Sequence, residues 1–387
     1  MNEYREGNCI TLLHCGVEYF PALEAAIDSA QREIHLETYI FADDPSGRRI
    51  AYALMRAAHR GVNVRTIVDG FGSRGFAGKI LDEMAAEGVN VAIYRPEPKW
   101  FDFRKSRLRR LHRKLAVIDA SVAFVGGINI IDDLNGLNFD PDSPPRFDFA
   151  VRVEGPLLAD IHAAAHRLWV VLNWRQLGGQ RRQQPPLVPK ADPCGTQVAA
   201  FVTRDNFRSR RDIERGYLLA IHGAREEIVI ANAYFFPGRH FRRALLRARR
   251  RGVRVILLLQ GKVEYVLLHY ASRALYGKLL EAGVEIIEYH GSFLHAKVAT
   301  VDRQWATVGS SNIDPFSLWL AREANVFVRD PGFAAALDQQ LQNAIKEGAR
   351  RIEHEHWSER SVLDRGMTWL FYVVVRRLLG LIGFADR

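Results

Sequence analysis

Histidine and lysine residues that could act on a phosphate occur in two stretches of the sequence with the same spacing. Each stretch carries the pattern H-x-K-x4-D, and in both copies a glycine follows fourteen residues after the histidine. The two copies lie 183 residues apart, whether the histidines or the glycines are compared, which indicates a duplication. The motif residues are His112, Lys114, Asp119, Gly126, Gly127 and Asn129 in the first copy, and His295, Lys297, Asp302, Gly309, Ser310 and Asn312 in the second.

This combination of side chains suits a phosphate ester. Lysine supplies positive charge, glycine lets backbone N–H groups approach an anion, and histidine can attack phosphorus or move a proton. Each motif opens an apolar, β-branched run that predicts a buried strand, on which alternate side chains share a face. The histidine and lysine of each copy then point to one side. Asp119 and Asp302 have the opposite parity at the strand end, where we expect them to support the site without touching substrate.

Two acidic residues follow the motifs at similar distances. Asp148 lies 36 residues after His112, and Glu323 lies 28 residues after His295, each at the start of a strand-like run. A carboxylate that accepts the second ring N–H of a histidine fixes its tautomer and raises its basicity. We therefore expect Asp148 and Glu323 to orient the histidines, the alternative being solvated acids at strand ends.

The elements around the motifs repeat in the same order, and residues 48–60 read as a helix between two strands. An internal duplication of this β-α-β-α kind predicts two α/β sheets with helices on both faces. The predicted strands are 33–41, 60–70 and 87–94 in the first half, and 226–236, 251–261 and 281–289 in the second. The expected organisation is a first domain at 1–175, a linker rich in Pro, Gly and Gln at 176–196, a second domain at 197–350, and a C-terminal tail at 351–387.

Composition limits the partners. The 387 residues are 48% apolar, enough for a large core, and carry a formal net charge of +10. That charge implies an anionic partner, which could be a nucleic acid, an anionic membrane face or a phosphate-bearing substrate. Basic clusters at 104–114 and 242–254 are both expected to adjoin the site. The three cysteines show no metal spacing and fit a reducing compartment without disulfides, and the N-terminus shows no signal pattern.

The most apolar stretch is the C-terminal segment 366–384. It does not suit a transmembrane span, because Arg376 and Arg377 inside it would each cost about 2.5–3.5 kcal/mol at a bilayer centre. Aromatic residues before the arginines and aliphatic residues after them suit a helix that lies at a membrane interface. The alternative is a buried C-terminal helix.

The motifs together resemble the phospholipase D superfamily, whose mark is a duplicated H-x-K-x4-D with a downstream Gly-Gly or Gly-Ser and an asparagine. The order of ETYIF, HRKLAVIDASVAFVGGIN, LHAKVATVDRQWATVGSSNIDP and EANVF further resembles bacterial cardiolipin synthases of the shorter B type. The resemblance covers roughly residues 5 to 340. Gly127 stands where many members, and the second copy at Ser310, have serine, which puts equal roles for the two halves in doubt.

The resemblance implies two duplicated domains that face each other as a pseudo-dimer, with both histidines and both lysines converging on one phosphate. One histidine, His112 by resemblance, attacks phosphorus, and the other protonates the leaving alcohol. The charge on the phosphate oxygens would be stabilised by Lys114, Lys297, Asn129, Asn312 and Ser310. No metal and no cofactor is implied.

The implied reaction transfers a phosphatidyl group between two molecules of phosphatidylglycerol, through a phosphohistidine, and yields cardiolipin and glycerol. The implied partners are phosphatidylglycerol and anionic lipids at the cytoplasmic side of the cell membrane, reached by peripheral association, and no nucleic acid. A phospholipase D that hydrolyses lipids or uses another alcohol, and a nuclease of the superfamily, remain alternatives. A non-enzymatic binding module would leave the paired histidines and lysines unexplained.

Overall fold

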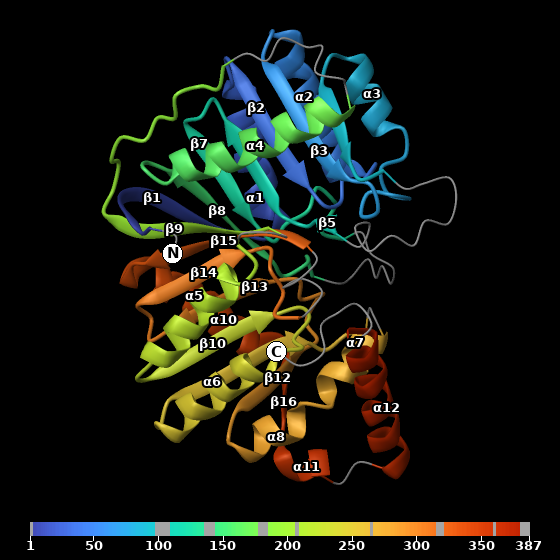
Figure 1. Cartoon of the computed structure of the whole chain (residues 1–387), viewed down its shortest axis with the longest axis vertical. Helices are drawn as coiled ribbons and strands as arrows, with labels where there is room; N and C mark the ends of the chain where they lie inside the picture. Colours follow the sequence, from blue (N-terminus) through green and yellow to red (C-terminus); the bar gives the residue numbers. More distant parts are fainter. Residues whose placement is uncertain are drawn as a thin grey trace.

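The two sequence repeats form the two halves of one mixed sheet in the computed structural model (Figure 1). The structure describes residues 3–96, 109–134, 144–176, 185–205, 209–263, 266–314, 321–358 and 361–379. The first-half strands are β1 (Arg5–His14), β2 (Glu33–Thr38), β3 (Asn63–Asp69), β4 (Asn90–Tyr94), β5 (Arg110–Leu111), β6 (Lys114–Ile118), β7 (Val122–Gly126) and β8 (Phe149–Glu154). The second-half strands are β9 (Gln197–Arg204), β10 (Glu227–Asn232), β11 (Arg254–Gln260), β12 (Glu285–Tyr289), β13 (Lys297–Val301), β14 (Trp305–Gly309), β15 (Ala321–Arg329) and β16 (Ala349–Ile352).

The strand order is β16-β12-β11-β10-β13-β14-β15-β9-β1-β8-β7-β6-β2-β3-β4, and β5 pairs with β15. In the first half β2, β3 and β4 run parallel, and the motif hairpin of β6 and β7 joins them antiparallel to β2. The second half repeats this arrangement with β10, β11 and β12 and the hairpin of β13 and β14. The halves join where β9 pairs with both β1 and β15 (Figure 1). The predicted α/β class and the facing duplicated domains are confirmed.

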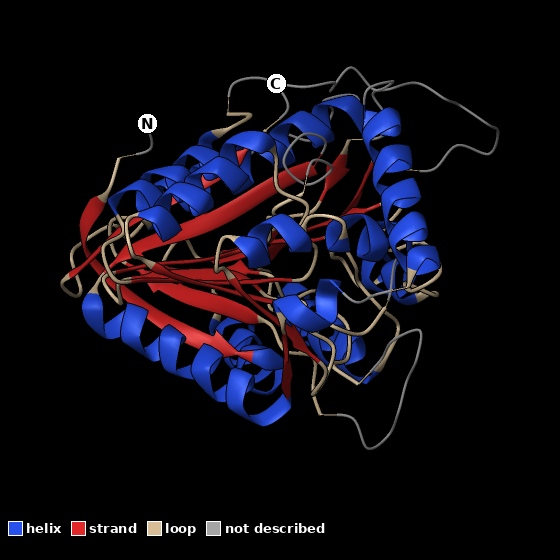
Figure 2. Cartoon of the chain, turned by 90° about the horizontal axis from the view of Figure 1, so that it is seen from below, coloured by secondary structure: helices blue, strands red, loops and turns tan. Residues whose placement is uncertain are grey.

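Helices cover both faces of the strands (Figure 2), which is why the motif strands read as continuous apolar runs. The first-half helices are α1 (Cys15–Ser29), α2 (Pro45–His59), α3 (Ile80–Ala86) and α4 (Leu158–Gln176). The second-half helices are α5 (Asp212–Gly223), α6 (Arg239–Arg250), α7 (Val266–Arg273), α8 (Tyr276–Glu281), α10 (Pro331–Gly348), α11 (His354–Ser358) and α12 (Val362–Leu379). Between the end of α4 and the start of β9, the described residues 185–196 form no helix or strand.

Two helices begin at an aspartate that caps their first turn, which explains where the chain turns from the sheet into the helix. Asp44 caps α2 by accepting a hydrogen bond from the backbone N–H of Gly47 at 2.8 Å, and Pro45 follows it. Asp330 caps α10 in the same way, with Phe333 N–H at 2.7 Å. An acidic cap followed by proline satisfies or removes the unpaired N–H groups of a first helical turn.

The basic cluster at 242–254 was expected beside the site, and that expectation is wrong. Helix α6 begins after the C-terminal end of β10 and runs back, so the cluster ends at the opposite edge of the sheet. There Arg251 donates to backbone carbonyls at the end of α5, and Arg254 forms ion pairs with Glu227 and Glu285. In the other basic cluster, residues 104–108 lie outside the described part of the chain.

The C-terminal segment forms α12, which packs along α7 (Figure 1). Val375 is buried, the Phe371 ring stacks on Tyr270 at 5.4 Å, and the Tyr372 ring lies 5.8 Å from Phe236. Phe371 and Tyr372, expected at a membrane interface, therefore contact the protein instead. The opposite face of α12 exposes the side chains Met367, Trp369, Leu370 and Val374. Residues 380–387, which complete the predicted aliphatic part of the tail, lie outside the described residues. Within the described chain, we find no helix with the length and apolar character needed to span a membrane.

Candidate active site

The two motif histidines lie just ahead of their strands. The motif strands begin at Lys114 and Lys297, so His112 and His295 belong to the approaching chain and not to β6 and β13. Each lysine side chain turns back toward its own histidine. Nζ of Lys114 donates to the backbone carbonyl of His112 at 2.7 Å, and Nζ of Lys297 donates to that of His295. The lysine of each copy is thus held to the main chain of its histidine. That the two side chains share one face stays a prediction.

The backbone of each histidine is held by the other half of the molecule. The N–H of His112 donates to the carbonyl of Arg322 at 3.0 Å, where β5 lies parallel to β15. In the mirrored contact, the N–H of His295 donates to the carbonyl of Phe147 at 2.9 Å. Arg322 and Phe147 directly precede Glu323 and Asp148. The main-chain contacts therefore bring each predicted carboxylate to the histidine of the opposite half.

The side chains complete this crosswise arrangement. Nδ1 of His112 lies 2.9 and 3.1 Å from the two carboxylate oxygens of Glu323, and Nδ1 of His295 lies 2.6 Å from Oδ2 of Asp148. A carboxylate accepts, so Nδ1 carries the proton and Nε2 of each ring is left to act on a substrate. Both carboxylates are almost completely buried.

The buried charges in this region act on one another. Burial lowers the pKa of Lys114 to about 7, and burial also lowers the pKa of both histidines, that of His295 well below its usual range. The charge of Lys297 contributes to lowering all three of these pKa values. Burial raises the pKa of Asp148 to about 6. An excess of buried positive charge is what an anionic phosphodiester would neutralise.

Gly127 and Ser310 occupy equivalent positions with different contacts. The hydroxyl of Ser310 donates to Oε2 of Glu323 at 2.5 Å and accepts from the N–H of Ala324 at 3.1 Å. A side chain at 127 would meet Asp148, because a Cβ there would lie 2.2 Å from Oδ1. The first half therefore combines a glycine with the carboxylate Asp148, and the second half combines a serine with Glu323. Ser310, which is predicted to bind phosphate, is hydrogen-bonded to the carboxylate that holds His112, and its role in phosphate binding stays a prediction.

The two predicted asparagines are buried just after the glycine turns. Oδ1 of Asn129 accepts from the N–H of Ile40 at 3.2 Å, which fixes the side chain near the end of β2. Oδ1 of Asn312 is buried without a hydrogen-bond partner among the described residues. A role of Asn129 and Asn312 in phosphate binding stays a prediction.

Asp119 and Asp302 lie at the far ends of β6 and β13, beyond the strands that carry the motif lysines. Each begins a hairpin turn with positive φ, +49° at Asp119 and +51° at Asp302. Asp119 accepts from the backbone N–H groups of residues 31–33 at 2.7 to 2.9 Å, and Asp302 from those of 225–227 at 2.8 to 2.9 Å. They attach the motif hairpin to the start of β2 and β10. A supporting role without substrate contact stays a prediction for both.

Two residues near His112 were missed from the sequence. The Tyr39 ring meets the His112 ring edge-on at 4.9 Å, and Nζ of Lys114 lies 5.4 Å from the Tyr39 ring centre. Asp69 is buried and accepts from the N–H of Leu111 at 2.8 Å, which fixes the residue before His112. The available signal was position, because Tyr39 follows β2 and Asp69 ends β3, and the C-terminal ends of these parallel strands meet on one side of the sheet.

The family comparison matches each half of the chain once. A family model described as cardiolipin synthase, PLD-like domain, matches residues 23–141 and 217–345. "Cardiolipin synthase B" of Escherichia coli (strain K12) is 38% identical over 391 residues, covering 98% of this chain and 91% of that protein. "Major cardiolipin synthase ClsA" of Bacillus subtilis (strain 168) is 31% identical over 374 residues, covering 94% of this chain and 74% of that protein.

Solved structures share the fold at low sequence identity. A phosphatidylserine synthase from Haemophilus influenzae Rd KW20 aligns with a TM-score of 0.70 at 14% identity, covering 97% of this chain and 95% of that chain. A polyphosphate kinase from Porphyromonas gingivalis aligns with a TM-score of 0.57 at 16% identity, covering 97% of this chain and 53% of that chain. At these identities the likeness shows the fold alone.

Proposed function

We propose, from the premise that this chain belongs to the cardiolipin synthase family of the phospholipase D superfamily, that it joins two molecules of phosphatidylglycerol into cardiolipin and glycerol. Membership in this family makes the chain an enzyme, a phosphatidyltransferase, as the duplicated motif predicted. The observation that carries the proposal is the crosswise pairing of His112 with Glu323 and of His295 with Asp148. Because Nδ1 of each imidazole faces a carboxylate, Nε2 is the ring nitrogen that can act on a substrate, and two buried lysines belong to the same motifs.

In the first step Nε2 of His112 attacks the phosphorus of one phosphatidylglycerol. The bond from phosphorus to the glycerol oxygen breaks, and His295 gives its Nε2 proton to that oxygen, so glycerol leaves. The product is a phosphatidyl group covalently bound to His112. Lys114 and Lys297 stabilise the charge that builds up on the phosphate oxygens.

In the second step the terminal hydroxyl of another phosphatidylglycerol attacks the same phosphorus. His295, now neutral, takes the hydroxyl proton as general base, and the bond from phosphorus to His112 breaks. The anionic substrate has a further effect. Burial, together with the positive charges of Lys297 and Lys114, lowers the pKa of His295 in the free enzyme, and the negative charge of the substrate opposes the contribution of the lysines. Substrate binding thereby favours the protonated His295 that the first step needs.

One assay separates this proposal from its rivals. Purified protein is incubated with phosphatidylglycerol vesicles and, separately, with a supercoiled plasmid. Cardiolipin formed with an equal amount of glycerol supports the proposal. Phosphatidic acid as the main lipid product would instead make the enzyme a phospholipase D, and plasmid nicking without lipid turnover would make it a nuclease.

The intermediate is tested with variants of the two histidines. His112→Ala and His295→Ala should each lose nearly all turnover. Given a phosphatidyl ester of p-nitrophenol, whose leaving group needs no proton from His295, His295→Asn should accumulate phosphatidylated protein, detected by mass spectrometry. The reason is that the general base of the second step is gone. His112→Asn should accumulate none. Covalent lipid on His112→Asn but not on His295→Asn would reverse the assignment.

We further propose that the enzyme associates peripherally with an anionic membrane through α12, on the cytoplasmic side. Asn232, at the end of β10, pairs with Lys297 on one side and with Leu259 of β11 on the other. The C-terminal end of β11 therefore lies on the same side of the sheet as the motif lysine Lys297. From this end the chain continues to α7. Helix α12 packs along α7, and its outer face exposes Trp369, Leu370 and Val374. An exposed apolar face in a chain of net charge +10 fits an anionic lipid surface. Three free cysteines support the cytoplasmic side.

Membrane association is tested by charge substitutions on this face. Leu370→Glu together with Val374→Glu should leave the protein folded and weaken sedimentation with phosphatidylglycerol vesicles, since both side chains are exposed. Leu219→Glu on α5, also an exposed leucine, is the matched control and should bind like the parent. Unchanged vesicle binding by the double variant would exclude α12 as the contact.

A further inference from the structure

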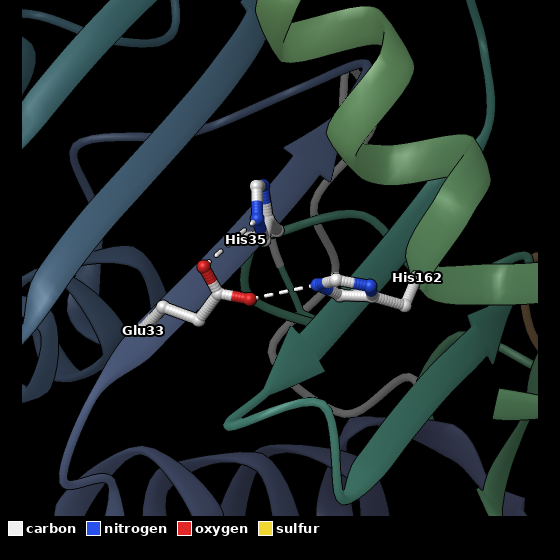
Figure 3. A group of neighbouring side chains, drawn as sticks. All are labelled: Glu33, His35 and His162. Carbon is white, nitrogen blue, oxygen red and sulfur yellow. Dashed lines mark hydrogen bonds and ion pairs between the residues drawn. The ribbon is translucent and has the colours of Figure 1, made fainter. Parts of the chain in front are cut away.

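A buried cluster of one carboxylate and two imidazoles lies between β2 and α4 (Figure 3). None of its residues belongs to the two motifs. Glu33 and His35 are two residues apart on β2, so their side chains point to the same face of the sheet. His162 approaches them from α4. All three side chains are almost completely buried, and one donor atom from each lies within 4.8 Å of the others. Nε2 of His162 lies 2.7 Å from Oε1 of Glu33, and Nε2 of His35 lies 3.7 Å from Oε2.

The duplicated fold does not require this cluster. In the first half His35 pairs with Arg65 across β2 and β3. The equivalent pair across β10 and β11 is Val229 with Ile256, and both side chains belong to the apolar core. Burying polar groups in the first half costs free energy that the second half avoids. The cluster therefore calls for a function of its own.

The donor set is one that transition metals accept. Two imidazoles and a carboxylate are a known zinc ligand set, and tetrahedral bonds of about 2.0–2.1 Å place the donor atoms about 3.3–3.4 Å apart. The two distances from Glu33 lie on either side of that value. A further imidazole stands one helical turn on. The His166 ring lies 6.1 Å from the rings of both His35 and His162, and it is outside the group whose donor atoms lie within 4.8 Å of one another. Nδ1 of His166 is buried with no hydrogen-bond partner among the described residues.

Arg65 already places a cation at the cluster. Its Nη1 lies 3.1 Å from Oε2 of Glu33 and 3.0 Å from Nε2 of His35, between two of the donor atoms. Its Cζ lies 6.0 Å from the ring centre of Trp169, a face toward which the guanidinium can shift. We propose that Glu33, His35 and His162 bind a divalent transition-metal ion such as Zn²⁺, with His166 as fourth donor, and that Arg65 is the cation the ion displaces. The ion joins β2 to α4 and stabilises the first half without entering the reaction.

The test measures zinc binding by the full chain after treatment with EDTA and dialysis, in competition with a chromogenic chelator. The parent protein should bind one Zn²⁺, and His162→Ala and His166→Ala should each weaken binding by about tenfold or more. Arg65→Gln should tighten binding, because a positive charge beside the ion is removed. His59→Ala is the matched control, since it removes an exposed histidine bound to Glu87 and should leave binding unchanged.

Thermal unfolding gives a second readout that does not depend on activity. Zn²⁺ should raise the Tm of the parent protein and of His59→Ala, and raise it less in His166→Ala, because an ion that binds only the folded state stabilises it. Because His166 is only half-buried, that variant keeps the test valid if His162→Ala does not fold. The proposal is overturned if the parent binds no zinc, if zinc binds only Arg65→Gln, or if both histidine variants bind like the parent.

Discussion

Glu323, in the second half of the chain, accepts a hydrogen bond from Nδ1 of His112, in the first half, at 2.9 Å. The reciprocal bond joins Asp148 in the first half to His295 in the second at 2.6 Å. Neither motif is complete by itself, because the carboxylate that orients each histidine comes from the opposite repeat. The site consequently depends on the junction of β9 with β1 and β15, which sets the two halves face to face.

The crosswise bonds predict different defects for the two carboxylates. Asp148→Asn and Glu323→Gln should each lower turnover by about 10- to 100-fold, the usual range for groups that orient a functional histidine. A phosphatidyl ester with p-nitrophenol as leaving group needs no proton from His295. With this ester, the rate of the first step in Asp148→Asn should therefore return toward that of the parent protein, whereas the rate in Glu323→Gln should stay low. The opposite pattern, measured as the p-nitrophenol burst, would assign each carboxylate to the histidine of its own half.

Gly127 should not tolerate a side chain. In Gly127→Ala the new Cβ would lie 2.2 Å from Oδ1 of Asp148, so Asp148 must move and His295 loses its partner. We expect a loss in kcat of about 10- to 100-fold. Ser310→Ala at the equivalent position introduces no clash and removes one hydrogen bond to Glu323, so its loss should be smaller. Comparable losses in the two variants would show that crowding of Asp148 is not the cause.

The charge of Lys114 should set the alkaline limit of activity. Burial lowers its pKa to about 7, so the side chain is positive below that pH and neutral above it. Since a neutral amine binds phosphate poorly, kcat/KM should fall as the pH rises through about 7. In Lys114→Arg the charge persists, and the profile between pH 7 and 9 should be flat at a lower level. If kcat/KM of the parent protein fell only near the ordinary pKa of lysine, this prediction would be contradicted.

Asp119 and Asp302 should affect stability more than chemistry. Each accepts three backbone N–H groups at the far end of a motif hairpin, and solvent can replace part of that bonding. Asp119→Ala and Asp302→Ala should each lower the free energy of unfolding by about 1–3 kcal/mol. Activity per folded molecule at 25 °C should remain close to that of the parent. Calorimetry measures the Tm, and initial rates measure the activity. A loss of activity at an unchanged Tm would contradict this prediction.

The sequence by itself determined the features that depend on local pattern. The duplicated H-x-K-x4-D spacing, the apolar runs of β6 and β13 and the helix between β2 and β3 follow from residue type and periodicity, so they were predictable. The same holds for Asp148 and Glu323, which were found because each starts a strand-like run at a similar distance after its motif. Their partners were not predictable, since the bonds cross 147 and 211 residues of chain.

Only the tertiary structure decided which groups face one another. The contact between Gly127 and Asp148 arises where segments far apart in sequence meet. The same is true of the ring contacts of Phe371 with Tyr270 and of Tyr372 with Phe236. Likewise His162 reaches Glu33 across 129 residues because α4 folds back over β2. A spacing rule carries no information about such contacts, because they depend on how strands pair and helices cover them, and those are properties of the whole chain.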